Sequence, residues 1–230
     1  MGLLAGYALP SVAPLVPRLA AALRIPTRLT DPGAVAITFD DGPGPEGTPS
    51  VLEVLDRERV SATFFLVGEQ VRRSPALAAE IVAAGHTVQL HGDRHRNQLR
   101  LTPGQIRDDL RRGAEAIEQA TGRVTPFYRP PYGIFSALGL RAVNHSRYEP
   151  LLWSRWGRDW GGRATGASVA AEATRGLEGG DVILLHDVDH YSDPECWRAT
   201  ASALPRIIEV VRDRGLRPIP LRGPADAQSR

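Results

Sequence analysis

Short apolar runs alternate with helix-like stretches along most of this chain, and this alternation limits the folds open to it. From residue 34 onward, β-branched and aromatic runs are separated by stretches with apolar residues at helical spacing. The expected strands read AVAITF, ATFFLV, TVQL, TPFYRP, EPLLWS, DVILLH and PIPL. Repeated strand–helix units favour an α/β fold, in which helices cover a parallel sheet.

The expected helices fill the intervals between these strands. They read TPSVLEVLDRERV, SPALAAEIVAAG, LTPGQIRDDLRRGAEAIEQATG and WRATASALPRIIEVVRDRG. The last of them is expected to end at Gly215, with Pro205 marking a kink or a late helix start.

Size and composition fit a single domain and exclude some chemistry. With 230 residues and 42% hydrophobic content, the chain can bury a full core. Its 28 basic residues are all arginines, but they are scattered among 26 acidic residues, so we expect no nucleic-acid partner. Cys196 is the single cysteine, which excludes an intrachain disulfide and a thiolate zinc cluster. Any bound metal must use histidine and carboxylate ligands.

Residues 1–33 form an apolar leader ahead of the first expected strand. Pro10, Pro14 and Pro17 interrupt it well short of the roughly 20 apolar residues that a membrane span needs. We therefore expect a leader that packs on the protein or touches a membrane. Residues 34–221 are expected to form the main domain, and 222–230 a frayed tail.

Chemically active side chains follow the ends of five expected strands. They are Asp40-Asp41 after AVAITF, His91 and His95 after TVQL, RPPYG after TPFY, GRDW after EPLLWS, and His186 after DVILL. Parallel strands of a barrel end on one face, so these groups are expected to converge there.

The segment LHGDRH places His91 and His95 four residues apart. If the segment turns helically, both imidazoles lie on one side. One added carboxylate gives a set that suits zinc or a similar divalent ion and leaves positions for water and substrate. The alternative is a pair of surface histidines in an Arg-rich loop. The nearby Asp-Asp pair favours the metal site.

Asp40 and Asp41 end an apolar run, where two like charges repel each other and resist desolvation. One carboxylate could bind a cation while the other stays free as a general base acting on water. An Asx-type turn is the alternative, which accounts for Gly42 and Pro43 but not for the second aspartate.

Arg129 and His186 each have a functional and a structural interpretation. Arg129 could orient a carboxylate through a bidentate pair, whereas the prolines after it suggest a rigid surface turn. His186 could be an acid, because it is far in sequence from the histidine pair, or simply a hydrogen-bonded rim residue.

Five motifs follow one another between residues 34 and 221: TFDDGP, HGDRH, RPPYG, RDW and LLH. This combination resembles the polysaccharide deacetylase family, carbohydrate esterase family four, which includes chitin, chitooligosaccharide and peptidoglycan deacetylases. The resemblance implies a deformed, incomplete (β/α) barrel as the catalytic domain. It also implies metal-dependent removal of an N-acetyl or O-acetyl group from a sugar.

Roles of individual residues follow from the same resemblance. Asp40 matches the general base, and Arg129 matches the residue that orients it. The matching metal ligands are Asp41, His91 and His95.

The remaining matches concern the leaving group and the acetyl group. His186 matches the general acid, and Asp159 matches the carboxylate that holds it. Trp160 and Leu184 match the apolar walls around the acetyl methyl. The backbone N–H of Tyr132 matches a donor to the developing oxyanion.

The chain departs from the family pattern at supporting positions. Gly92 stands where the family usually has Ser or Thr, and Trp156 where it usually has an earlier Asp, so the departures concern substrate geometry. The segment DVDHYSDPECW is hypothesised to line a rim of the cleft with Asp189, His190 and Tyr191; a solvated loop is the alternative.

The expected activity is removal of N-acetyl groups from a glycan containing N-acetylglucosamine, with release of acetate. The alternatives are an O-acetyl esterase acting on xylan-like sugars and a non-catalytic sugar-binding barrel. We expect one divalent ion, zinc before cobalt, nickel or manganese. We also expect a monomer. The substrate class favours a location of the protein in the extracellular space or the cell envelope, with the cytoplasm as the alternative.

Overall fold

The computed structural model describes residues 6–123, 126–146 and 148–223. Its elements run in the order η1 (Leu9–Leu15), α2 (Pro17–Ala22), β1 (Ala34–Asp40), α3 (Gly47–Glu58), β2 (Thr63–Leu66), α4 (Gly68–Arg73), α5 (Pro75–Ala83), β3 (Thr87–Leu90), η2 (Gln98–Arg100), α6 (Pro103–Thr121), β4 (Phe127–Tyr128), η3 (Pro131–Gly133), α7 (Ala137–Asn144), β5 (Glu149–Pro150), β6 (Arg155–Trp156), α8 (Gly166–Thr174), β7 (Val182–His186), α9 (Trp197–Asp213) and β8 (Arg217–Pro218).

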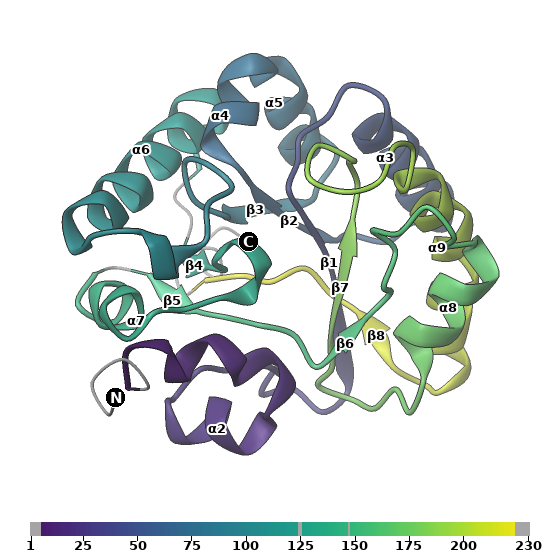
Figure 1. Cartoon of the computed structure of the whole chain (residues 1–230). Coiled ribbons are helices and arrows are strands. Elements are labelled where there is room, and N and C mark those ends of the chain that lie inside the picture. Colours follow the sequence, from purple (N-terminus) through teal and green to yellow (C-terminus); the bar gives the residue numbers. More distant parts are fainter. Residues whose placement is uncertain (1–5, 124–125, 147, 224–230) are drawn as a thin grey trace.

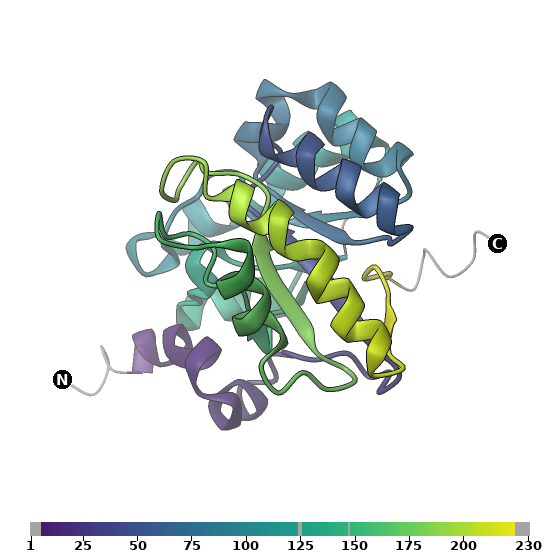
Figure 2. The same ribbon diagram turned by 90° about the vertical axis from the view of Figure 1, so that its right-hand side faces the viewer.

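The strands form one curled parallel sheet. Within the described residues the order is β5-β4-β3-β2-β1-β7-β6, with β8 beside β1, and every pair of strands is parallel. Figure 1 shows the helices in a ring round this sheet, and Figure 2 shows α8 and α9 side by side over β7. The expected α/β fold, an incomplete barrel, is confirmed.

The central strand β1 positions the site. All of its residues are buried, which suits the β-branched and aromatic run that forms it. Asp40 at its end is level with Phe65 on β2 and with His186 on β7. The sheet register therefore brings two of the expected site residues to the same edge.

The run EPLLWS is not the single strand that its apolar pattern predicts. Its first two residues form β5 beside β4, and β6 follows at the opposite edge of the sheet, beside β7. Between the two edges, Leu151 N–H bonds the Tyr128 carbonyl at 3.0 Å, and Ser154 N–H bonds the Val182 carbonyl at 3.0 Å. The run is apolar because it crosses a buried part of the barrel, where Leu152 is fully buried.

Two short helices in the leader pack on the protein. Ala13, Ala20 and Ile25 belong to the hydrophobic core, and Figure 1 shows η1 and α2 at the bottom of the helix ring. No helix among the described residues is long and apolar enough to cross a membrane. Of the expected tail, residues 224–230 lie outside the described part of the chain.

The last expected helix forms as α9. It begins at Trp197 and contains Pro205, so this proline does not mark a late start. The chain turns at Gly215, two residues after the helix ends, where φ is +69°.

Candidate active site

The two adjacent aspartates are both buried, with exposed fractions of 3%, but their surroundings differ. Asp40 is the last residue of β1 and has regular strand pairing. Asp41 has a positive φ of +79°, which turns the chain away from the strand. Strained backbone of this kind persists where the surrounding structure enforces it, and such residues are common at functional sites.

Arg129, which does not line the pocket, forms a hydrogen bond to Asp40. Its Nη1 donates to Asp40 Oδ1 at 2.6 Å and to Thr38 Oγ1 at 2.9 Å. Its Nε and Nη2 donate to the carbonyls of Leu151 and Leu152 at 3.3 and 3.1 Å. The guanidinium is fully buried and lies 4.0 Å from the centroid of the Phe65 ring. Arg129 and Asp40 therefore share one short hydrogen bond and not the expected bidentate pair. The carbonyls of Leu151 and Leu152, in the segment that crosses the barrel, accept from the other guanidinium nitrogens.

The two histidines that follow β3 converge on Asp41. We call Asp41, His91 and His95 the β3 cluster. Both Nε2 atoms lie 3.2 Å from Asp41 Oδ1. The expected helical turn is absent: residues 91–97 form a loop in which Gly92 has a φ of +91°. The loop nevertheless brings both imidazoles to one side.

The β3 cluster has the chemistry of a cation site. Its ligand atoms lie within 4.8 Å of one another, and Asp41 Oδ1 is buried without a hydrogen-bond partner among the described residues. Burial raises the pKa of Asp41, but the facing imidazoles and the charge of His186 outweigh burial and hold the pKa well below its usual value. An ionised carboxylate beside two imidazoles fits a divalent ion.

A second group of side chains, which we call the β7 cluster, consists of His186, Asp159 and Thr200. His186 Nδ1 lies 2.9 Å from Asp159 Oδ1. Asp159 Oδ2 accepts from the His186 backbone N–H and from Thr200 Oγ1, both at 2.6 Å. Burial lowers the pKa of His186, but the charge of Asp159, the hydrogen bond to it and the charges of Asp41 and Asp40 raise the pKa to about 10.

Both clusters open into one pocket of about 280 Å³. The residues that line it are Asp40, Asp41, His91, His95, Tyr132, Gly133, Trp153, Trp156, Trp160, Leu184, His186, Tyr191 and Ser192. The three expected substrate-contacting residues, Tyr132, Trp160 and Leu184, are all part of this lining. Arg129 and Asp159 lie behind it, each holding one side chain that faces the pocket.

The sequence did not single out part of this wall. Trp153, Trp156 and Trp160 form a row with ring centroids 6.2 and 5.6 Å apart, and Trp160 lies edge-on to His186. Trp153 gave no signal, because it falls in a run that predicts a buried strand. Trp156 is distinctive in the sequence only as a departure from the family pattern.

The hypothesised rim loop contributes one of its three candidates. Tyr191 lines the pocket. Asp189 Oδ2 instead accepts from the Glu195 backbone N–H at 2.7 Å, which stabilises its own loop. His190 Nε2 lies 3.4 Å from the Pro43 carbonyl.

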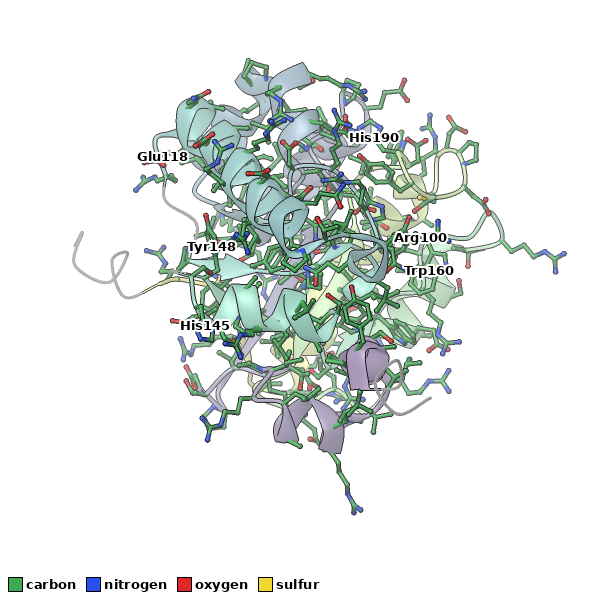
Figure 3. The ribbon with its side chains drawn as sticks, turned by 60° about the vertical axis from the view of Figure 1, so that its left-hand side comes forward. Arg100, Glu118, His145, Tyr148, Trp160 and His190 are labelled. Carbon is green, nitrogen blue, oxygen red and sulfur yellow. The ribbon has the colours of Figure 1, made fainter. Side chains whose placement is uncertain are left out.

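A larger cavity of about 680 Å³ lies between α6 and α7, and its lining includes Glu118, His145 and Tyr148. Figure 3 shows these residues on the opposite side of the molecule from Trp160 and His190. None of the expected site residues lines this cavity. The smaller pocket is therefore the candidate active site, because chemically matched groups converge there.

Residues 27–151, more than half of the chain, match the family model described as polysaccharide deacetylase. This chain belongs to the polysaccharide deacetylase family. It is 33% identical over 195 residues to a chitooligosaccharide deacetylase of Bradyrhizobium sp. (strain ANU 289), covering 82% of this chain and 89% of that protein. It is 30% identical over 186 residues to a peptidoglycan-N-acetylglucosamine deacetylase of Bacillus cereus, covering 80% and 84%.

A solved relative extends the likeness to three dimensions. The family 4 acetyl xylan esterase of Clostridium thermocellum, in complex with a cobalt ion, superimposes with a TM-score of 0.73 and 31% identity. The match covers 81% of this chain and 87% of that one. The predicted family is thus confirmed, and the roles of its individual residues stay predictions.

Proposed function

We propose that this polysaccharide deacetylase removes N-acetyl groups from a glycan that contains N-acetylglucosamine and releases acetate. The observation that carries the proposal is the meeting of the β3 cluster, Asp40 and the β7 cluster in one pocket, with His186 Nε2 3.9 Å from Asp41 Oδ2. Cation ligands, a carboxylate base and a histidine acid are the groups that amide hydrolysis needs.

Asp41, His91 and His95 would hold one divalent cation. Zinc is our first choice, because two imidazoles and one carboxylate suit it, and cobalt, nickel or manganese are the alternatives. When bound, the cation supplies a Lewis acid that polarises the acetyl carbonyl and lowers the pKa of a water molecule.

Asp40 takes the proton of the attacking water. Its Oδ1 is occupied by Arg129 at 2.6 Å, while its Oδ2 lies on the side of the β3 cluster, 3.9 Å from His91 Nε2. Arg129 thereby orients the carboxylate and leaves one oxygen for the proton.

His186 gives a proton to the leaving amine. Because Asp159 occupies Nδ1, Nε2 is the nitrogen left for the substrate. The raised pKa of His186, about 10, keeps the imidazole protonated at neutral pH, as a general acid requires.

The aromatic side of the pocket receives the acyl group. Leu184 and Trp160 line it beside His186, and they form the apolar surface that we assign to the acetyl methyl. The backbone N–H of Tyr132, in a short turn with φ +60°, is our candidate donor to the developing oxyanion.

Names of relatives support the N-acetyl substrate and also one alternative. Two relatives act, by name, on chitooligosaccharide and on peptidoglycan N-acetylglucosamine. The acetyl xylan esterase likeness favours O-acetyl xylan as a second candidate, since the same pocket could hydrolyse an ester. A non-catalytic sugar-binding role finds less support, because base, ligands and acid are all present.

Acetate release tests the proposal. Metal-stripped protein is assayed with N-acetylglucosamine oligomers and with acetylated xylan, with and without Zn²⁺ or Co²⁺, beside Asp40→Asn. We expect cation-dependent release from the oligomers and a loss of roughly 10²–10⁴-fold in the variant, because a general base is removed. Release only from xylan supports the esterase, and no release from folded, cation-loaded protein supports the binding role.

Further predictions concern the partners of the protein and its location. The proposed substrate is an acetylated glycan, and we predict that the protein acts as a monomer without nucleic acid. Contact of residues 1–33 with a membrane and a location outside the cytoplasm also stay predictions.

A further inference from the structure

The loop after β7 brings an aromatic ring onto a candidate ligand. In Figure 1 this loop lies above the tip of the β7 arrow. The Tyr191 ring stacks on the His95 imidazole with centroids 4.1 Å apart and planes 10° apart. Tyr132 contacts the same imidazole edge-on, with centroids 4.4 Å apart and planes 64° apart. His95 is therefore in contact with two aromatic rings.

The hydroxyl of Tyr191 fixes the position of its ring. It donates to Glu69 Oε1 at 2.9 Å and accepts from Gln70 Nε2 at 2.9 Å. Both partners lie in the first turn of α4. Gln70 is itself buried, with an exposed fraction of 3%.

The same turn of α4 also holds the loop that carries His95. Gly68 N–H donates to the Gly92 carbonyl, and Glu69 N–H donates to the Asp93 carbonyl, both at 2.9 Å. The start of α4 therefore fixes the imidazole through the backbone and the stacked ring through its hydroxyl.

At its other end the Tyr191 loop is tied to the aromatic wall. Asp193 N–H donates to the Trp160 carbonyl at 3.1 Å, and Asp193 Oδ2 accepts from Gly162 N–H at 2.5 Å. The loop therefore has one fixed point on each side of the pocket, Tyr191 on α4 and Asp193 beside Trp160.

His95 needs such a contact because its second nitrogen is not engaged. In metal sites a ligating imidazole usually donates its other N–H to a neighbour, which fixes the plane of the ring. His95 Nδ1 is buried and has no hydrogen-bond partner among the residues that the structure describes. A flat ring in parallel contact can set the same plane without a hydrogen bond.

We propose that Tyr191 is a positioning residue for His95 and that it raises the affinity of the β3 cluster for its cation. A bound cation withdraws electrons from the His95 imidazole. The electron-rich face of the Tyr191 ring then attracts this imidazole more strongly. This inference rests on the proposed function, because that function assigns the cation to the β3 cluster.

Cobalt binding to metal-stripped protein tests the proposal without using activity. Affinity is measured by titration calorimetry and coordination geometry by the visible absorption of Co²⁺, for wild type, Tyr191→Leu, Tyr191→Phe and His190→Ala. We expect Tyr191→Leu to weaken binding about tenfold or more and to change the spectrum, as for loss of a group that orients a ligand. Tyr191→Phe keeps the ring but loses the hydroxyl anchor, so we expect a loss of about threefold, smaller than that of Tyr191→Leu. His190→Ala, the control from the same loop, removes an edge contact with the Tyr191 ring (centroids 6.1 Å apart) but leaves the stack on His95, and it is expected to match wild type.

A second variant separates positioning from folding. Glu69→Ala removes the acceptor of the Tyr191 hydroxyl from a partly exposed site, and we expect it to weaken Co²⁺ binding by about threefold with an unchanged melting temperature of the metal-free protein. Wild-type affinity and spectrum in Tyr191→Leu, or in Glu69→Ala if Tyr191→Leu does not fold, would overturn the proposal.

The outcomes also separate this proposal from the proposed function. Wild-type protein that binds no Co²⁺ overturns both. Wild-type protein that binds Co²⁺ but releases no acetate overturns the function alone, and the order of affinities still decides the role of Tyr191.

Discussion

The β3 and β7 clusters use the same residue types in opposite ways. In the β7 cluster the carboxylate of Asp159 lies on the side of the imidazole that faces away from the pocket. Both of its oxygens accept hydrogen bonds, one of them from His186 Nδ1. In the β3 cluster the carboxylate lies in front: Asp41 Oδ1 faces two Nε2 atoms and has no hydrogen-bond partner among the described residues. The first arrangement holds a proton on the ring, and the second leaves lone pairs for a cation.

The backbones of the clusters differ in the same sense. His186 ends a regular strand, level with Asp40. His91 and His95 lie on an irregular loop with Gly92 at φ +91°, and Asp41 has φ +79°. Regular pairing is enough to place one acid, whereas bringing three ligand atoms together requires backbone conformations outside the strand and helix regions.

Removing a ligand is expected to have the largest effect. His95→Ala should abolish measurable Co²⁺ binding and lower acetate release by about 10³-fold or more, because several kcal/mol of charge stabilisation depend on the cation. Calorimetry and an acetate assay on the same preparation measure both. Full Co²⁺ affinity in this variant would remove His95 from the β3 cluster.

Removing the acid is expected to separate binding from turnover. His186→Ala should lower kcat by about 10²–10⁴-fold, because protonation of the leaving amine is lost. Its affinity for Co²⁺ should stay near that of wild type, since His186 belongs to the β7 cluster. A variant that loses cation binding instead would show that the two clusters are not distinct in function.

The pH profile tests the carboxylate behind His186. A histidine acid must be protonated, so activity falls as pH rises through its pKa, and Asp159 extends activity upward by raising that pKa. Asp159→Asn should therefore move the alkaline limb of kcat/KM down by about 1–3 pH units. A cation at the β3 cluster offsets the contribution of Asp41 but not that of Asp159, so the difference between the two profiles isolates Asp159. Identical alkaline limbs would mean that Asp159 does not set the pKa of the catalytic acid.

Sequence patterns predicted the parts of this fold in which burial and strand pairing coincide. The strands around Ala34–Asp40, Thr63–Leu66 and Thr87–Leu90 appear where the apolar runs predict them. The prediction of a single strand over residues 149–154 was wrong. An apolar run indicates burial, but it does not distinguish a strand from a buried segment that crosses the barrel.

Motif order predicted which residues gather in the pocket, but not how each is held. Arg129 makes one contact with Asp40 because its other donors meet carbonyls of the crossing segment, which was not foreseen. Tyr191 was a rim candidate, and its stack on His95 depends on Glu69 and Gln70, more than 100 residues away in sequence. Contacts of this kind depend on tertiary packing, which spacing within a motif does not encode.

The smallest expected effect concerns the backbone of the β3 cluster. A Cβ at Gly92 would lie 2.6 Å from Asp109 Oδ2, the oxygen that also accepts from the Asp93 N–H at 3.0 Å. Gly122, at φ +65°, has no atom within 4 Å of its Cβ position and serves as a matched control. Alanine at Gly122 should cost about 1–2 kcal/mol of unfolding free energy from backbone strain alone. Alanine at Gly92 should cost about 1–3 kcal/mol more, because the Asp109 carboxylate must move.

Urea unfolding of the metal-free variants measures that difference, and a Co²⁺ titration shows whether it reaches the ligands. Asp109 also accepts from Arg96 Nη2 at 2.7 Å, so a displaced carboxylate would loosen the loop on both sides of His95. We therefore expect weaker Co²⁺ binding in Gly92→Ala but not in Gly122→Ala. Equal destabilisation and unchanged affinity would mean that the space at Gly92 is not needed for cation binding, and that a Ser or Thr side chain there would cost only the backbone strain. Reduced affinity would instead explain glycine at this position, because Asp109 occupies the space that a side chain would need.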